Sequence, residues 1–408
     1  MAKIDELLKE LCPDGVEWKT IKELFETRNG YTPSTKNSSF WTNGDIPWFK
    51  MEDIRDKGHI LADAYSHITK SALKGKGLFK ANSIILATSA TIGEHALITV
   101  DHLSNQRFTN IYPKEKWVNK IHMKFVYYYM YLIDEWCKTH VKQGSFAAVD
   151  MDGFYKQEIP IPPLSIQQEI VEVLDTFTDA ISNLEEELAL REKQFEFYKE
   201  QLLSFDDEAS LGGKLFSDKV KYVKLKDICL NICSGGTPLT SNKEYYSGSN
   251  PWLRTQEVDW NDVYDTELKI SEDAIKNSSA KLIPANCLIV AMYGATAGKC
   301  CINRIPLTTN QACCNLQIDE RQALVKYVFH WVCKEYHHIK SMGEGSQSNL
   351  NAQKVKSYPV PLPSISSQKE IVEILDTFEA MIANIKEEIA LRTKQYEYYR
   401  EKLLSFGK

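Results

Sequence analysis

Long apolar runs are missing from this sequence of 408 residues. No stretch approaches the ~18 consecutive apolar residues that a membrane-spanning helix needs. The acidic residues Asp5 and Glu6 stand where a secretory signal peptide would carry a basic and then an apolar segment. We therefore expect a chain that is neither secreted nor held in a membrane and that works in the cytoplasm.

Paired cysteine motifs are missing too. The chain has ten cysteines but no C-x-x-C sequence. Two adjacent pairs, Cys300-Cys301 and Cys313-Cys314, lie in apolar surroundings, and neighbouring residues of a strand point to opposite faces, which is poor geometry for joint metal ligation. This usage predicts free thiols in a reducing compartment and no metal site.

The common catalytic signatures are missing as well, since no G-x-G-x-x-G, H-E-x-x-H or G-x-S-x-G occurs. The segment 294–300 resembles a P-loop, but it is one residue too short between its glycines and has cysteine in place of Ser or Thr. It therefore predicts a turn. Glu267 and Lys269 form an E-x-K fragment of the kind seen in metal-dependent nucleases, but no suitable aspartate strand precedes it. We expect a chain without catalytic residues.

What the sequence does contain is a globular balance, with 43% hydrophobic and 25% charged residues and a length that favours two to three domains. The net charge of −6 is unevenly distributed, because residues 159–209 hold 13 acidic and 3 basic side chains. The acidity of that segment does not exclude a basic surface elsewhere, so nucleic-acid binding stays open.

The chain carries an internal repeat. Residues 159–205 reappear at 360–406, an offset of 201, and 28 of the 47 aligned positions are identical. Weaker echoes at offsets near 204 lie upstream of each copy: a G-x-T-P turn, a Pro-Trp pair and an Asn-Gln pair. The sequence thus predicts two variable domains, at 1–158 and 210–358, each followed by a repeated segment, at 159–209 and 359–408.

Each repeated segment predicts a long coiled-coil helix. Prolines end the preceding strand, Ser165 and Ser366 are placed as N-caps, and apolar residues then recur in steps of four and three over five heptads. If the two helices pair within the chain, connectivity makes them antiparallel. A single amphipathic helix on a globular core is the alternative. The seam residues are Leu174, Phe177, Ile181, Leu184 and Leu188, with their copies Leu375, Phe378, Ile382, Ile385 and Ile389.

A second apolar stripe lies off this seam. Leu190 and Phe197 are one heptad apart, and their copies are Leu391 and Tyr398. Pairing of the two helices does not bury these positions. One reading is that they pack on the chain's own domains; the other is that both copies present the same docking surface to two identical partner subunits.

The variable domains have ~150 residues each, enough for a core of their own. Short β-branched runs at 83–88 and 288–291, broken by turn residues, and helical stretches near 121–139 and 321–340 predict α+β domains with curved sheets. Their loops carry hydroxyls, amides and cations of the kinds that hold phosphates or read base edges. The candidate DNA-binding residues are Tyr31, Thr32, Ser34, Lys36, Lys50, Lys142, Gln143, Ser145, Thr237, Ser241, Lys243, Arg254, Gln256, Ser346, Gln347 and Asn349.

These features together resemble the DNA-specificity subunit of Type I restriction-modification systems. The resemblance rests on the paired segments Ile159–Val171 and Val360–Val372, on the G-x-T-P turns and on the coiled-coil copies, and it covers essentially the whole chain. The first G-x-T-P turn departs from the second, with Tyr31 where the other has Gly236.

The resemblance implies two target-recognition domains, each reading half of a split sequence in double-stranded DNA. The antiparallel coiled coil, with pseudo-two-fold symmetry, would set the spacer and dock two methyltransferase subunits. Restriction subunits are a further possible partner. The chain itself would bind no cofactor; S-adenosylmethionine, ATP and magnesium would belong to the partners. Two alternatives stay open: a protein–protein scaffold with a coiled-coil rod, and a stand-alone nuclease using Glu267 and Lys269.

Overall fold

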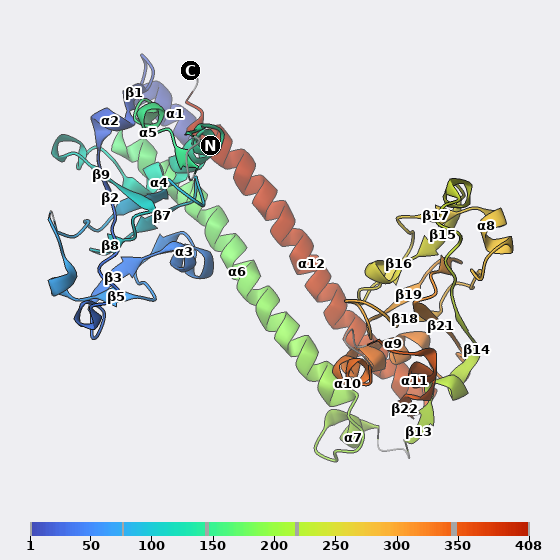
Figure 1. Cartoon of the computed structure of the whole chain (residues 1–408). Helices are drawn as coiled ribbons and strands as arrows, with labels where there is room; N and C mark the ends of the chain where they lie inside the picture. Colours follow the sequence, from blue (N-terminus) through green and yellow to red (C-terminus); the bar gives the residue numbers. More distant parts are fainter. Residues whose placement is uncertain (1, 76, 143–146, 217–219, 344–348, 407–408) are drawn as a thin grey trace. The chain divides into compact units, whose positions relative to one another are not determined.

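The computed structural model describes residues 2–75, 77–142, 147–216, 220–343 and 349–406 (Figure 1). The chain divides into two compact units: unit 1 is Met1–Leu184 with Glu388–Lys408, and unit 2 is Glu185–Glu387. Both units contain sheets and helices, so the predicted α+β class is confirmed. Within the described ranges, no helix is long and apolar enough to cross a membrane.

Unit 1 is built on a five-stranded sheet with strand order β2-β9-β6-β7-β4. All neighbouring strands pair antiparallel except β4 and β7, which run parallel. The strands are β2 (Phe25–Asn29), β9 (Phe108–Pro113), β6 (Ser83–Ala87), β7 (His95–Ile98) and β4 (Ile60–Leu61).

The position of the central strand β6 between two cores explains why its sequence is a continuous apolar run. Ile84 and Leu86 belong to the core that α4 covers, while Ile85 and Ala87 belong to a second core on the other face. Because side chains alternate along a strand, a strand covered on both faces needs apolar residues at every position. The predicted strand at 83–88 is confirmed.

Unit 2 repeats this sheet with the order β14-β21-β18-β19-β16. In β18, Leu288 and Val290 face one core while Ile289 and Ala291 face another, as in β6. The unit thus has the same strand order as unit 1 although the two variable segments share little sequence. The strands are β14 (Cys229–Ser234), β21 (Cys313–Ile318), β18 (Leu288–Ala291), β19 (Cys300–Asn303) and β16 (Asp262–Val263).

A three-stranded sheet accompanies each main sheet, with order β5-β3-β8 in unit 1 and β17-β15-β20 in unit 2. In both, the central strand pairs antiparallel with one neighbour and parallel with the other. The strands are β5 (His67–Ile68), β3 (Ile46–Phe49), β8 (Leu103–Ser104), β17 (Lys269–Ile270), β15 (Asn250–Leu253) and β20 (Thr308–Thr309).

Two-stranded ladders lead into the long helices. β12 (Glu158–Ile161) pairs with β1 (Glu17–Thr20), and β22 (Pro359–Leu362) pairs with β13 (Lys221–Lys224). Each ladder has only two strands, so prolines are tolerated at its open edges. A last pair joins β10 (Val141–Lys142) and β11 (Ala148–Val149).

The helical stretches predicted near 121–139 and 321–340 are also present. Unit 1 has α4 (Met123–Thr139), and unit 2 has α9 (Val325–Lys334) followed by α10 (Tyr336–Ser341). The other short helices are α1 (Ala2–Leu11), α2 (Ile21–Leu24), α3 (Met51–Lys57), α5 (Met151–Phe154), α7 (Leu211–Leu215), α8 (Glu272–Lys276) and α11 (Ala352–Ser357).

The repeated segments form the two long helices α6 (Leu164–Leu202) and α12 (Ile365–Leu404) in Figure 1. The predicted caps at Ser165 and Ser366 are wrong, because both serines already lie inside the helix and the cap position is two residues earlier. In α12 the cap is Ser364, whose hydroxyl accepts the Ser367 N–H at 3.2 Å. Pro163 takes this position before α6, and its carbonyl accepts the Gln167 N–H at 3.1 Å.

A buried glutamine fixes the start of each long helix. The Gln167 side chain accepts from the His122 N–H at 2.8 Å and donates to the carbonyls of Lys120 and Pro162. Gln368 makes the same three bonds in unit 2, to Leu324, Gln322 and Pro363. Each glutamine therefore joins its long helix to the loop before α4 or α9. This role was not predicted.

The long helices contact each other in opposite order along the chain. In unit 1, Phe177 of α6 stacks on Tyr399 of α12; in unit 2, Tyr198 of α6 stacks on Phe378 of α12. Phe177 and Phe378 are equivalent positions of the repeat, as are Tyr198 and Tyr399, so one contact is made twice. An early residue of one helix meets a late residue of the other, which is antiparallel pairing.

The predicted seam residues lie at covered positions of these helices. Leu174 and Leu375 are fully buried, in the cores of unit 1 and unit 2 respectively. The others are half-buried: Phe177, Ile181, Leu184, Leu188, Phe378, Ile382, Ile385 and Ile389.

Candidate nucleic-acid interface

The weak sequence echoes of the two variable domains meet in one structure, which occurs once in each unit. In unit 1 the G-x-T-P turn at 30–33 is held from one side by the Trp48 indole N–H, which donates to the Tyr31 carbonyl at 3.0 Å. From the other side, the Thr32 hydroxyl donates to the Gln106 side-chain oxygen at 2.5 Å. We call this arrangement the turn clamp.

Unit 2 builds the turn clamp from the corresponding residues. The Trp252 indole N–H donates to the Gly236 carbonyl at 3.0 Å, and the Thr237 hydroxyl donates to the Gln311 side-chain oxygen. The threonine and the glutamine are 74 residues apart in both units. The G-x-T-P, Pro-Trp and Asn-Gln echoes are therefore parts of one tertiary contact.

The first glycine of the turn is required by this contact. A Cβ on Gly30 would lie 2.2 Å from the Ser104 carbonyl oxygen, and one on Gly235 would lie 2.1 Å from the Thr309 carbonyl oxygen. Backbone atoms cannot yield to such an overlap, so no other residue fits here.

The asparagine of the Asn-Gln pair shapes the opposite side of the clamp. The Asn105 side-chain oxygen accepts the Arg107 N–H at 2.9 Å, and the Asn310 side-chain oxygen accepts the Ala312 N–H at 3.2 Å. These Asx turns place the glutamine between two fixed backbone positions. Gln106 and Gln311 were not among the predicted site residues, although the Asn-Gln echo pointed to them.

The predicted residues that follow each G-x-T-P turn lie close to it in sequence and are exposed: Ser34 and Lys36 in unit 1, Ser241 and Lys243 in unit 2. The Ser34 carbonyl accepts the Trp41 indole N–H at 3.1 Å, which fixes the loop. Tyr31 is half-buried, and its hydroxyl donates to the Ala72 carbonyl and accepts the Lys74 N–H, so this side chain holds the loop together.

The two predicted cations beside the tryptophans each form an ion pair with a carboxylate. Lys50 pairs with Glu52, and Arg254 pairs with Glu267. Both residues also begin short helical turns by donating a backbone N–H, to Asp53 and to Glu257. A phosphate contact by either cation would compete with these ion pairs. Gln256 lies in the same turn as Arg254 and is exposed.

Lys142 is paired with Asp150 at 2.7 Å and Asp152 at 2.9 Å, and Asn349 is exposed. Gln143, Ser145, Ser346 and Gln347 lie outside the described residues. No observation tests DNA contact by any of the sixteen candidates, so the set stays a prediction. Of the E-x-K fragment, Glu267 pairs with Arg254 and Lys269 with Asp265, each already engaged with a side chain of opposite charge.

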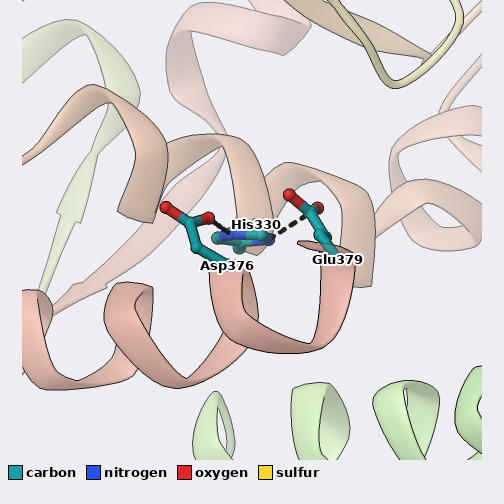
Figure 2. A group of neighbouring side chains, drawn as sticks. All are labelled: His330, Asp376 and Glu379. Atoms are coloured by element: carbon teal, nitrogen blue, oxygen red, sulfur yellow. Dashed lines mark hydrogen bonds and ion pairs between the residues drawn. The ribbon is translucent and has the colours of Figure 1, made fainter. Parts of the chain in front are cut away.

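A separate cluster in unit 2 has the residue types of a metal site. Figure 2 shows His330 of α9 between Asp376 and Glu379 of α12, with one ligand atom of each residue within 4.8 Å of the others. The two ring nitrogens face different carboxylates, Nε2 toward Asp376 at 3.2 Å and Nδ1 toward Glu379 at 3.8 Å. One ion cannot bind both nitrogens of one imidazole ring.

A lysine completes this cluster. The Lys326 ammonium lies 2.8 Å from Glu379 and 3.6 Å from Asp376, where it offsets the carboxylate charge. Unit 1 has the related contacts of Lys124 and Tyr128 with Asp175, at 2.7 and 2.5 Å. Both clusters join the long helix to the helix covering the main sheet, and we interpret the His330 cluster as an ion-pair network of this kind.

The residues of the second apolar stripe are more exposed than the other large apolar residues of the long helices. Leu190, Phe197, Leu391 and Tyr398 are 65%, 57%, 59% and 58% exposed. Other off-seam apolar residues, such as Val171 and Leu203, are buried in the cores of their own units. Each long helix thus exposes one leucine and one aromatic side chain a heptad apart, which makes these pairs a candidate protein-binding surface.

Comparison with known proteins places these features in a family. A family model described as "Type I restriction modification DNA specificity domain" matches residues 13–191 and 217–391. The two matched segments cover most of the chain and correspond to the two halves of the repeat.

Two curated relatives from Escherichia coli agree with this match. The chain is 47% identical over 225 residues to the Type I restriction enzyme EcoprrI specificity subunit, covering 52% of this chain and 56% of that protein. It is 34% identical over 309 residues to the EcoR124I/EcoR124II specificity subunit, covering 71% of this chain and 72% of that protein. The chain thus spans little more than half the length of the first relative.

Solved structures share the fold at low sequence identity. An S subunit of a Type I restriction-modification system from M. genitalium has a TM-score of 0.60 and 16% identity, covering 95% of this chain and 96% of that one. A chain solved in work on complex assembly and conformational transition of the type I R-M system has a TM-score of 0.63 and 15% identity, covering 96% and 97%.

Proposed function

The chain belongs to the family of Type I restriction-modification DNA specificity proteins, and from that premise we propose that each of its variable domains reads one half of a split sequence in double-stranded DNA. The observation that carries this proposal is the turn clamp, built twice from the same residue types on the same strand order. Two readers of one construction suit a target of two half-sites.

We propose that the long helices set the spacing between the half-sites. α6 and α12 have 39 and 40 residues, so each is ~60 Å long at ~1.5 Å per residue. Half-sites read from one side of B-DNA are ~34 Å, or one helical turn, apart. Helices of this length have enough reach to fix such a distance, which leaves the intervening bases unread.

We further propose that the chain supplies recognition and that its partners supply catalysis. Leu190 with Phe197, and Leu391 with Tyr398, are the proposed docking surfaces for two methyltransferase subunits. In this assembly S-adenosylmethionine belongs to the methyltransferase subunits, while ATP and magnesium belong to restriction subunits where these are present. The complex would work in the cytoplasm, where its DNA substrate lies.

Fluorescence anisotropy tests the DNA-binding proposal. The chain, alone and with its methyltransferase subunits, is titrated against labelled duplex DNA at several salt concentrations. Because DNA contacts release counterions, we expect the logarithm of the association constant to fall linearly with the logarithm of the salt concentration. Absent or salt-independent binding would favour the protein–protein scaffold. Plasmid cleavage by the purified chain with magnesium alone would favour the nuclease.

A further inference from the structure

Gln106 and Gln311 share one feature that the proposed function does not use. Both side chains are exposed, and both have their amide oxygen engaged by the threonine hydroxyl of the turn clamp. Among the residues that the structure describes, neither amide nitrogen has a protein acceptor. Each glutamine therefore presents two N–H donors to solvent in an orientation that the threonine fixes.

The turn that carries each glutamine is fixed to a neighbouring strand in both units. The Asn105 N–H donates to the Phe49 carbonyl at 3.0 Å, and the Asn310 N–H donates to the Leu253 carbonyl at 2.9 Å. This ties each Asn-Gln turn to the strand that carries the clamp tryptophan. A donor held by such a fixed turn loses little conformational freedom when it binds an acceptor, so more of its hydrogen-bond energy appears as affinity.

The same glutamine occurs in both units, but the residues next to it and next to the clamp threonine differ. The residue after the glutamine is Arg107 in unit 1 and Ala312 in unit 2, and the second turn residue is Tyr31 in one and Gly236 in the other. Side chains that read different half-sites must differ between the domains. A group that both domains keep suits what all DNA sequences share, the sugar–phosphate backbone.

The hydrogen-bonding groups that the two glutamines leave free are those that a DNA phosphate accepts. The two N–H groups of each glutamine match the phosphate oxygens, which only accept. Bidentate reading of adenine would need the amide oxygen as well as the nitrogen, and in both units threonine already occupies one of the two lone pairs of that oxygen and fixes its direction. A cation adjoins each site in sequence, Lys50 after Phe49 and Arg254 after Leu253, and each of these cations is paired with a carboxylate.

We propose that Gln106 and Gln311 are sequence-independent anchors, one in each variable domain, that donate their amide N–H groups to phosphate oxygens of the DNA. The inference rests on the proposed function and adds the division of labour within each domain: the clamped glutamine fixes the register of the domain on the duplex, and other loop side chains read the bases. Thr32 and Thr237 are positioning residues that act through the glutamines.

The test uses the complete chain assembled with its methyltransferase subunits. Binding is measured by anisotropy on two duplexes: one carries the target sequence identified by methylation mapping, and the other has the same composition in scrambled order. The variants are Gln106→Glu and Gln311→Glu, which keep the oxygen that accepts from threonine and replace only the N–H donors. Gln353→Glu, at an exposed position of α11, is the matched charge control.

We expect Gln106→Glu and Gln311→Glu each to weaken binding to both duplexes by the same factor, so that the ratio of the two affinities does not change. Gln106→Ala and Gln311→Ala, which add no charge, should each weaken both affinities about 3- to 10-fold, the effect of losing about one hydrogen bond. Their salt dependence should equal that of the wild type. Thr32→Val should give part of the Gln106→Ala loss, and the control variant should bind as the wild type does.

Three results would overturn the inference. Unchanged affinity on both duplexes would remove the glutamines from the interface. A loss confined to the target duplex would make them base readers. A wild-type complex that binds neither duplex would instead contradict the proposed function itself, which separates that failure from failure of the anchor. Thermal melting of each variant shows whether it is folded, and Thr32→Val tests the anchor in unit 1 with the glutamine unchanged.

Discussion

Phe177 of α6 stacks on Tyr399 of α12, with ring centroids 5.2 Å apart and ring planes inclined by 19°. The equivalent pair, Tyr198 and Phe378, has the same centroid distance and an angle of 22°. The repeated sequence thus makes its aromatic contact twice, once in each unit. Aromatic pairs of this geometry add about 0.5–1.5 kcal/mol beyond the area they bury.

We predict that Phe177→Ala lowers the free energy of unfolding by about 3 kcal/mol, the lower part of the range for a packed phenylalanine, because this ring is only half-buried. The measurement is urea denaturation of the complete chain. Phe197→Ala is the control, because Phe197 is exposed and lies next to the seam but not in it. This substitution should lower the free energy of unfolding by well under about 1 kcal/mol. Equal losses for the two variants would contradict the pairing.

The His330 cluster makes unit 2 sensitive to acid. Burial raises the pKa of Asp376, but the hydrogen bond with His330 and the charge of Lys326 together outweigh burial, so the pKa lies below its usual value. A carboxylate with a lowered folded-state pKa stabilises the fold above its unfolded-state pKa of ~3.9 and loses that contribution as the pH falls through the folded-state value.

We therefore predict that Asp376→Asn lowers the free energy of unfolding at pH 7 and flattens its decline below pH ~4. Unfolding is followed by denaturant titration at a series of pH values. Asp179→Asn, at an exposed position of α6, is the control. If both variants show the pH profile of the wild type, the cluster does not contribute to acid sensitivity.

The exposed stripe should be needed for assembly and not for folding. We predict that Leu190→Glu with Phe197→Glu leaves the melting temperature of the chain within ~2 °C but removes one of two methyltransferase subunits, because a charge replaces an apolar contact. Leu391→Glu with Tyr398→Glu should remove the other. Native mass spectrometry counts the subunits. Ser182→Glu, exposed on the same helix, should leave both bound, and retention of two subunits by the stripe variants would exclude this surface.

The spacing proposal predicts the effect of longer helices. One heptad inserted after Glu187 and one after Glu388, equivalent positions of the repeat, keep the seam periodicity and add ~10 Å to each helix. We expect the unread spacer of the DNA target to grow by about three base pairs, since each pair rises ~3.4 Å. Methylation mapping in cells that produce the lengthened chain reads the spacer directly. An unchanged spacer would show that the helices do not set it.

The features that could be predicted from the sequence are those with local periodicity. The apolar steps of four and three predicted the long helices α6 and α12 and the positions along them that are covered, and the run at 83–88 predicted β6, because each pattern reflects a face covered by neighbours. The N-caps were misplaced by two residues, since Ser364, two positions before the predicted Ser366, caps α12.

The contacts that tie distant segments together could not be predicted. Gln167 bonds to residues about 45 positions away, and Thr32 to a glutamine 74 positions away. No periodicity marks such pairs, because each partner is an ordinary polar residue in its own segment. The only signal was the internal repeat, in which the Asn-Gln pair appears at the same place in both halves although the surrounding sequence has diverged.

The two variable domains are proposed to read DNA independently of each other. The most direct measurement is methylation mapping by single-molecule sequencing in cells producing this chain with its methyltransferase, before and after residues 1–158 are replaced by the corresponding domain of another specificity subunit. We predict a split motif, modified on both strands, of which only one half changes after the exchange. A change in both halves, or a motif without an unread spacer, would contradict the account.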